Sequence, residues 1–151
     1  VRHEYFQDGQ CALQDEQDIV YRGPTPPKLS GTEALPEGQW QEQVEPSPTL
    51  LFRYSALTFN THRIHYDAPY AQGVERYRGL VVHGPLTASL LLQLAAAELG
   101  ENRLRSFAFR GLSPAIAGEP LHLVMRRGEA GYDLAAFAAD GRQVTQASAA
   151  A

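Results

Sequence analysis

One apolar helix limits what this chain can fold into. The segment begins with Gly84-Pro85, and proline is favoured at the first helical position because its missing amide hydrogen is no loss there. It ends at Gly100, a residue type that favours the C-terminal end of a helix. Leucines and alanines cover nearly every face of the predicted helix over residues 85–99. A helix this apolar is expected to be wrapped by other structure.

The segments around this helix predict strands that can wrap it. Turn residues at 114–118, 128–131 and 140–141 separate four extended runs, which are Arg103–Leu112, Leu121–Arg127, Tyr132–Ala139 and Gln143–Ala149. We also predict a strand over Leu50–Phe59, followed by an irregular turn or short helix over Asn60–Gln72. The expected fold class is α+β, with a curved antiparallel sheet around one long central helix.

The first 49 residues have a different character. Residues 1–22 hold an Asp8-Gly9 turn between two extended runs, which predicts a β-hairpin. A lone hairpin is marginal in water, so we expect it to join a larger sheet. Residues 23–49 contain six of the 10 prolines and predict a linker, which leaves residues 50–151 as the main domain. Because the chain enters a strand-like run at Val1, we expect a fragment or a processed chain.

Charge and cysteine content exclude several classes of function. The net charge of −4 argues against a nucleic-acid binder, which needs a basic surface to neutralise phosphates. The most apolar segment, Leu86–Leu99, is too short for a membrane span and contains Gln93 and Glu98. Cys11 is the only cysteine, so internal disulfides and thiolate-rich metal sites are excluded. These features fit a reducing compartment, and we expect a cytoplasmic location.

Histidines in two short stretches suggest chemistry. His62 and His65 lie in the predicted turn between Asn60 and Asp67, and His83 stands immediately before the apolar helix. Histidine is the usual general acid or base near neutral pH. The first turn of a helix presents unpaired amides and a positive dipole end, which stabilise negative charge on a carbonyl oxygen. A base facing such a helix end suits reactions that build an enolate-like charge.

These two stretches carry a family resemblance. Residues 58–67 (TFNTHRIHYD) and 79–86 (GLVVHGPL) resemble the MaoC-like hot-dog hydratases and dehydratases. They are most similar to the double-hot-dog branch, which includes itaconyl-CoA and mesaconyl-CoA hydratases and the mitochondrial hydroxyacyl-thioester dehydratase. The resemblance covers residues 50–149 as one hot dog. Residues 1–22 look like the closing strands of an upstream, degenerate hot dog.

The resemblance implies roles for individual residues. His65 falls on the family's catalytic histidine, and Asn60 falls on a position that is acidic in the family motif. A neutral amide orients water but takes no proton at pH 7, so the departure shifts the work onto His65. Gly84 falls on the backbone donor to the thioester oxygen. Substrate contacts are expected from Arg53, Arg63, Tyr66 and His83, the two arginines being suited to a free carboxylate on the acyl group.

Structural alternatives exist for several of these residues, and for His65 the alternative is a polar histidine of the core or of a turn. Asn60 also suits a turn, the two arginines also suit a solvated surface, and His83 also suits support of the helix entry. His62 and His65 have the spacing of a metal pair, but the sequence offers no further ligand cluster and the family needs no metal. The resemblance implies no cofactor.

The resemblance implies a hydro-lyase that adds water reversibly to a 2-enoyl-CoA thioester, with itaconyl-CoA or mesaconyl-CoA as candidate substrates. Three alternatives stay open: a 3-hydroxyacyl-thioester dehydratase of fatty-acid synthesis, a non-catalytic acyl-CoA-binding hot dog, and a thioesterase. A single hot dog leaves sheet edges open, so we expect a homodimer or pairing with an N-terminal hot-dog half.

Overall fold

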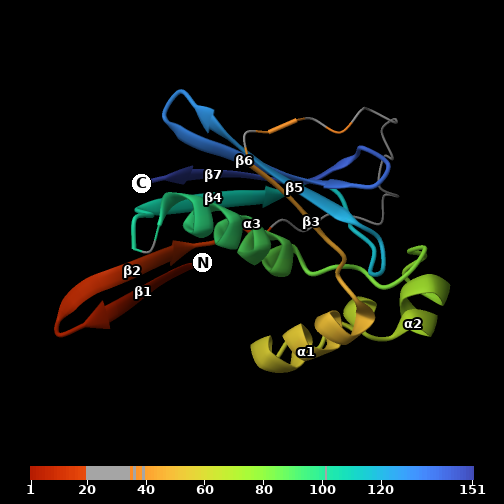
Figure 1. Ribbon diagram of the computed structural model, residues 1–151. Helices are drawn as coiled ribbons and strands as arrows, with labels where there is room; N and C mark the ends of the chain where they lie inside the picture. Colours follow the sequence, from red (N-terminus) through yellow and green to blue (C-terminus); the bar gives the residue numbers. More distant parts are fainter. Residues whose placement is uncertain (20–34, 36, 39, 101) are drawn as a thin grey trace.

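The computed structural model describes residues 1–19, 35, 37–38, 40–100 and 102–151 (Figure 1). Residues 20–22 of the predicted hairpin segment and most of the predicted linker lie outside the described residues. In chain order, the elements are β1 (Arg2–Gln7), β2 (Gln10–Glu16), β3 (Trp40–Val44), α1 (Pro48–Thr58), the short 3-10 helix η1 (Arg63–His65), α2 (Ala68–Gly73), α3 (Gly84–Leu99), β4 (Ser106–Gly111), β5 (Leu121–Gly128), β6 (Gly131–Ala138) and β7 (Gln143–Ala150).

A five-stranded antiparallel sheet packs against α3, as predicted. Its strand order is β3-β5-β6-β7-β4, and tight turns join β5 to β6 and β6 to β7. Figure 1 shows the sheet on one side of α3, with α1 and α2 at the N-terminal end of that helix. Buried side chains of α3 such as Leu91 and Leu94 meet Leu123 and Leu134 of the sheet in one apolar core. Apolar burial of this kind stabilises the fold by about 25 cal/mol per Å².

The long helix agrees closely with its prediction but is covered on fewer sides. It begins at Gly84 with Pro85 in its first turn and is capped by Gly100, whose φ is 94° and whose amide donates to the Ala96 carbonyl. Leu92 is 38% exposed, and Gln93 and Ala97 are also exposed. One side of α3 is therefore left uncovered by the residues that the structure describes.

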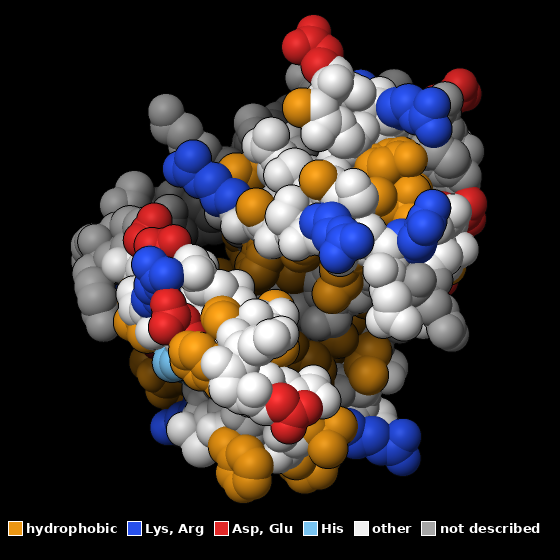
Figure 2. All heavy atoms as spheres, turned by 90° about the vertical axis from the view of Figure 1, so that its left-hand side faces the viewer, with side chains coloured by type: hydrophobic (Ala, Val, Ile, Leu, Met, Phe, Trp, Pro, Cys, Tyr) orange, Lys and Arg blue, Asp and Glu red, His pale blue; other side chains and the backbone are white. Residues whose placement is uncertain are grey.

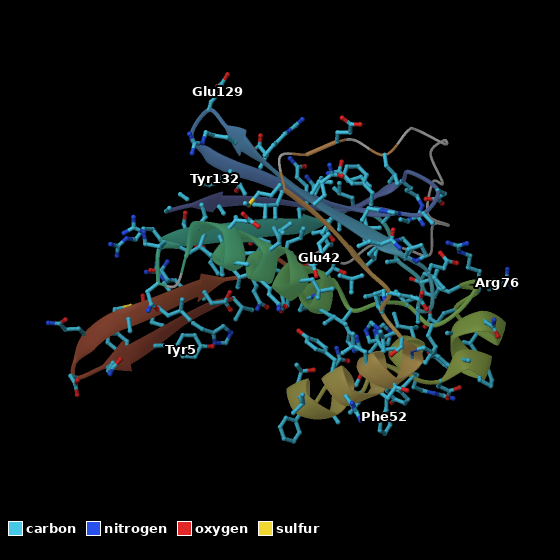
Figure 3. All side chains as sticks on the ribbon, in the orientation of Figure 1. Tyr5, Glu42, Phe52, Arg76, Glu129 and Tyr132 are labelled. Atoms are coloured by element: carbon cyan, nitrogen blue, oxygen red, sulfur yellow. The ribbon has the colours of Figure 1, made fainter. Side chains whose placement is uncertain are left out.

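The strand predicted over Leu50–Phe59 is wrong, because residues 48–58 form the helix α1. The hydroxyl of Ser47 accepts from the Leu50 amide at 3.1 Å, and Pro48 begins the helix. Leu51 and Ser55, four residues apart, share the buried side. Figure 3 shows Phe52 pointing outward from α1, and it is 63% exposed.

One strand of the main sheet lies within the range that we predicted as a linker. β3 pairs with β5 from Trp40 opposite Met125 to Val44 opposite Leu121. The sheet therefore recruits residues before position 50, and the linker prediction is wrong for Trp40–Val44. Pro46, which follows this strand, is fully buried, and its carbonyl accepts from the Gly118 amide at 2.9 Å.

The N-terminal hairpin is confirmed as a hairpin, but it stands apart from the five-stranded sheet. β1 and β2 are antiparallel and form a two-stranded sheet of their own around Asp8 and Gly9, both with positive φ. Nearly every residue of the pair is exposed, including the apolar Tyr5, Phe6 and Leu13. Figure 2 faces this end of the molecule and shows hydrophobic side chains at its surface.

Candidate functional site

Two segments that are distant in the sequence lie side by side before α3. The amide of Val81 donates to the carbonyl of Ile64 at 2.9 Å, which joins η1 to the residues that lead into α3. Val81 also bridges to Ile116, and the Val82 amide donates to the Ala115 carbonyl at 2.9 Å. The structure thus brings together the two histidine-bearing stretches that the sequence singles out.

His65 lies at the centre of this arrangement. Its side chain is buried, and its Nδ1 lies 2.7 Å from the carbonyl oxygen of Val81. A carbonyl oxygen only accepts hydrogen bonds, so Nδ1 carries the hydrogen and Nε2 of the neutral ring holds the lone pair. Burial lowers the pKa of His65 below its ordinary 6.5, the bond to Val81 opposes that shift, and His62 adds to it. His65 is therefore a neutral base at neutral pH.

His83 lies directly against His65. The two imidazoles are stacked, with ring centroids 3.7 Å apart and planes 18° from parallel. His83 is only 1% exposed, and burial lowers its pKa to about 4, with the neighbouring His65 as the second cause. The ring therefore lies buried against His65, and the substrate contact that we expected from it stays a prediction.

Gly84 begins α3 immediately after His83. It is exposed, and a Cβ built on it would meet none of the surrounding side chains within 4 Å, so the space beside its Cα is open. Pro85 has no amide hydrogen, and the first amide to bond back is that of Thr87, which donates to the His83 carbonyl at 3.1 Å. No described residue accepts from the Gly84 N–H, so within this part of the chain it is available to an anion or a carbonyl oxygen.

Asn60 adopts the turn arrangement that was its structural alternative. Its Oδ1 accepts from the His62 amide at 2.9 Å, and its own amide donates to the Ser55 carbonyl at 2.9 Å. These bonds terminate α1 and begin the turn that carries His65. The amide NH₂ of Asn60 has no partner among the residues that the structure describes, so it remains a donor for water.

Arg63 is already paired on the surface. Its Nε and Nη2 both donate to Oδ2 of Asp67, at 3.0 and 2.7 Å, and its guanidinium lies 4.0 Å from the centroid of the Tyr70 ring. The Arg63 bond is the largest cause that lowers the pKa of Asp67, and the bond from the Tyr70 amide adds to it. A substrate carboxylate would thus compete with Asp67 for Arg63.

The remaining predicted substrate contacts are exposed. Arg53 lies on the outer side of α1. Tyr66 is 41% exposed, and its hydroxyl donates to the Thr61 carbonyl at 2.7 Å, within the same turn. These positions are compatible with contact to a large ligand, and their roles stay predictions.

The sequence analysis missed two residues at this site, Ser55 and Tyr54. The Ser55 hydroxyl lies 2.8 Å from Nε2 of His83, and the Tyr54 ring packs against the His83 ring with centroids 4.9 Å apart. Both residues come from α1, and the strand prediction for this segment concealed them. A helical reading would have indicated Ser55, because it is a polar residue on the same side as Leu51.

The described residues contain no cluster of metal-binding side chains. No group of three or more His, Cys, Asp or Glu side chains is arranged there to hold an ion. Within the same part of the chain, no helix combines the length and apolar character that crossing a bilayer requires.

Comparison with solved structures identifies the fold. The unliganded R-hydratase PhaJ1 from Pseudomonas aeruginosa matches with a TM-score of 0.63 and 20% identity, over 76% of this chain and 79% of that one. A MaoC-like dehydratase from Phytophthora capsici matches with a TM-score of 0.67 and 16% identity, over 91% of this chain and 45% of that one. The fold is a hot dog, as expected.

Comparison with curated sequences identifies the family. A mesaconyl-C(4)-CoA hydratase from Chloroflexus aurantiacus is 43% identical over 98% of this chain and 54% of its own length. A mitochondrial hydroxyacyl-thioester dehydratase type 2 from Schizosaccharomyces pombe is 33% identical over 81% of this chain and 42% of its own length. The chain therefore spans about half the length of these relatives. The model of one family matches residues 1–117, and the chain belongs to that family, hydroxyacyl-thioester dehydratase type 2.

Proposed function

We propose that this chain carries the catalytic half of a hydro-lyase that adds water reversibly to a 2-enoyl-CoA thioester. The observation that carries the proposal is that the buried, neutral His65 ring stacks on the ring of His83, the residue before the exposed Gly84, whose amide has no acceptor among the described residues. One group supplies a base, and the other supplies a donor for a carbonyl oxygen.

The reaction follows from these two groups. Nε2 of His65 removes a proton from water as the water oxygen bonds to the β carbon of the thioester. The electron pair of the double bond moves toward the thioester oxygen, which accepts the Gly84 N–H at the positive end of α3. The imidazolium then returns the proton to the α carbon, so dehydration is the same path in reverse. The Asn60 NH₂ holds the water by donating to it.

For the substrate we favour a short dicarboxylic acyl group, such as mesaconyl-CoA or itaconyl-CoA. The support is the 43% identity to a protein named as a mesaconyl-C(4)-CoA hydratase, together with the exposed guanidinium groups of Arg53 and Arg63, which suit a carboxylate. To bind the substrate carboxylate, Arg63 would either break its ion pair with Asp67 or bind both carboxylates at once. Arg63→Ala is then expected to raise KM for mesaconyl-CoA and to leave KM for crotonyl-CoA unchanged.

A 3-hydroxyacyl-thioester dehydratase of fatty-acid synthesis is the second candidate. The match to the hydroxyacyl-thioester dehydratase type 2 family and to the Schizosaccharomyces pombe relative supports it. It uses the same two groups in the dehydration direction. It differs in acyl length, and it predicts no preference for a free carboxylate.

The test is incubation with crotonyl-, mesaconyl-, itaconyl- and long-chain 2-enoyl-CoA, with double-bond absorbance and free thiol followed together. Loss of the double bond without thiol release is the expected result. Thiol release would indicate a thioesterase, and no change with any substrate would indicate an acyl-CoA-binding module. Faster turnover of long chains than of mesaconyl-CoA would favour the second candidate.

We also propose that the hot dog pairs, either with another copy or with an N-terminal hot-dog half. β4 bonds only to β7 among the described strands, and its exposed side includes Phe109 at 48%. The exposed hairpin β1–β2 points to the same need for a larger sheet. Light scattering of this chain, and of a chain extended to the length of the relatives, distinguishes the two kinds of pairing.

For location we propose the cytoplasm. The support is the single free and exposed Cys11. One relative is named mitochondrial, so the competing outcome is an organelle. Fractionation of cells that express the full-length gene with a C-terminal tag decides between them.

A further inference from the structure

Side chains from α1 and from the 3-10 helix η1 contact the ring of His83. Its Nε2 lies 2.8 Å from Oγ of Ser55, Tyr54 packs on it at 4.9 Å between centroids, and His65 stacks on it at 3.7 Å. The other ring nitrogen, Nδ1, is buried and has no hydrogen-bond partner among the residues described. Ser55 therefore makes the hydrogen bond that determines the rotation of the His83 ring.

The backbone of His83 determines the direction of the Gly84 amide. His83 is the N-cap of α3, and its carbonyl accepts from the Thr87 amide at 3.1 Å. The peptide unit between His83 and Gly84 is planar, so the Gly84 N–H points opposite to that carbonyl. One residue thus contacts the base through its ring and orients the donor through its backbone.

Ser55 brings α1 into this arrangement. It lies on the buried side of α1, 6% exposed, four residues after the fully buried Leu51. It is separated from His83 by 28 residues, so the bond joins two helices that no short loop connects. The position of α1 on the core therefore affects the position of the His83 ring at the start of α3.

We propose that Ser55 and His83 are a positioning pair: the Ser55 hydroxyl holds the His83 ring, and His83 holds the His65 imidazole and the Gly84 amide in register. The proposal rests on the proposed hydration, because it assigns that reaction its geometry. At neutral pH the buried His83 ring is uncharged, so it supports His65 without opposing its protonation during turnover. Among the described residues, the ionisable side chains with ring contacts to His65 or His83 are these two histidines themselves, His62 and Tyr54.

The first test compares hydroxyl variants on α1. Ser55→Ala is expected to lower kcat about tenfold with KM within twofold of wild type, because the base and the donor lose their register while the substrate site persists. Ser55→Thr, which keeps the hydroxyl, is expected to retain most of kcat. Thr58→Ala is the matched control, because its hydroxyl donates to the Tyr54 carbonyl at 2.7 Å on the exposed side of the same helix.

The outcomes are decided on folded protein, as judged by circular dichroism and thermal melting. A Ser55→Ala protein with kcat within twofold of wild type overturns the proposal, and so does a loss of kcat equal to that of Thr58→Ala. If Ser55→Ala does not fold, Ser55→Cys replaces it, because the thiol is close in size and a weaker hydrogen-bonding group. Ser55→Cys is expected to lower kcat, but by less than the tenfold expected of Ser55→Ala. Full activity of Ser55→Cys counts against the pair.

A spectroscopic test separates this proposal from the proposed function. In ¹⁵N-histidine NMR, His65 of the wild type should show the Nδ1–H tautomer, assigned by its loss in His65→Gln. In Ser55→Ala we expect a mixture of tautomers and a pKa of His65 that moves up toward its ordinary value. An unchanged tautomer and pKa overturn the positioning pair even if hydration is observed. A changed tautomer without any turnover by the wild type supports the pair and rejects the hydratase.

Discussion

Nδ1 of His65 lies 2.7 Å from the carbonyl oxygen of Val81, and this contact determines which nitrogen of the ring is basic. The Val81 amide donates to the carbonyl of Ile64, one residue before His65. Val81 therefore contacts this turn through both its N–H and its carbonyl oxygen. A ring fixed in this way presents Nε2 as a proton acceptor without reorganisation. The proposed chemistry depends on this tautomer.

Replacement of His65 by alanine should therefore remove most of the turnover. We expect kcat to fall by about 10²–10⁴-fold, the usual contribution of a general base. Binding of a non-reactive acyl-CoA should change little, since Gly84 and the rest of the site remain. Steady-state kinetics and calorimetric binding measure the two effects. A rate that stays within threefold of wild type would remove His65 from the role of base.

The pH dependence of the reaction should reflect the burial of the same ring. Because burial lowers the pKa of His65, the neutral basic form persists to a pH below 6.5. The value of kcat/KM should then fall on the acid side with an apparent pKa below 6.5. Initial rates across pH 4.5–8 in buffers of constant ionic strength provide the measurement. An apparent pKa above 7 would contradict the assignment.

Stability should also depend on pH, through His83. Its pKa is lowered to about 4 in the folded chain, from 6.5 in the unfolded chain, so the unfolded state binds more protons between these values. The contribution of His83 is complete above pH 6.5 and is lost as the pH falls toward 4, by an amount on the order of 3 kcal/mol. Urea unfolding at pH 7, 5.5 and 4 measures the loss. His83→Phe, which cannot titrate, should lose less between pH 7 and 4 than the wild type does, and equal losses would refute this account.

The sequence predicts the central helix and the last three strands well because their ends carry strong local signals. Pro85 and Gly100 delimit α3, and Asp140-Gly141 turns β6 into β7. Turns and caps depend on a few residues whose backbone preferences are intrinsic. Such elements therefore need no knowledge of the rest of the fold.

The segment around α1 could not be predicted in the same way. Residues 50–57 are mostly apolar, without a clean period of either two or 3.6 residues, and such runs are ambiguous between strand and helix. Ser47-Pro48 is a helix start, but it follows a proline-rich stretch that suggests a linker. Ser55 and its bond to His83 depend on the helical period of α1, so that part of the site appears only in three dimensions. The pairing of His65 with the start of α3 was indicated by the family resemblance.

Asn60 provides a fourth prediction, on the turn that carries His65. Asn60→Ala removes the acceptor of the His62 amide and should cost about 1 kcal/mol of unfolding free energy. It should also lower kcat, because the NH₂ donor to water is lost. Asn60→Asp keeps the acceptor and should retain wild-type stability. If the Asp and Ala variants are equally destabilised in urea, the Oδ1 bond is not what stabilises the turn.

Arg142 provides the last prediction, because it connects the sheet to the segment that holds Val81. The guanidinium is buried, and its Nη1 donates to Oγ of Ser113 and to the carbonyl of Pro114, both at 2.7 Å. Residues 115–117, which follow directly, pair with residues 80–82 next to His65. Arg142→Met keeps the apolar length but leaves the Pro114 carbonyl without its donor. We expect it to lower the unfolding free energy by about 2–3 kcal/mol and Tm by about 5–10 °C.

Asp140→Asn is the matched control for Arg142→Met. Asp140 is half exposed and its pairing with Arg142 spans 3.4 Å, so the loss of unfolding free energy should be below about 1 kcal/mol. Differential scanning calorimetry compares the two, and an Arg142→Met protein as stable as Asp140→Asn would show that the guanidinium does not hold this segment.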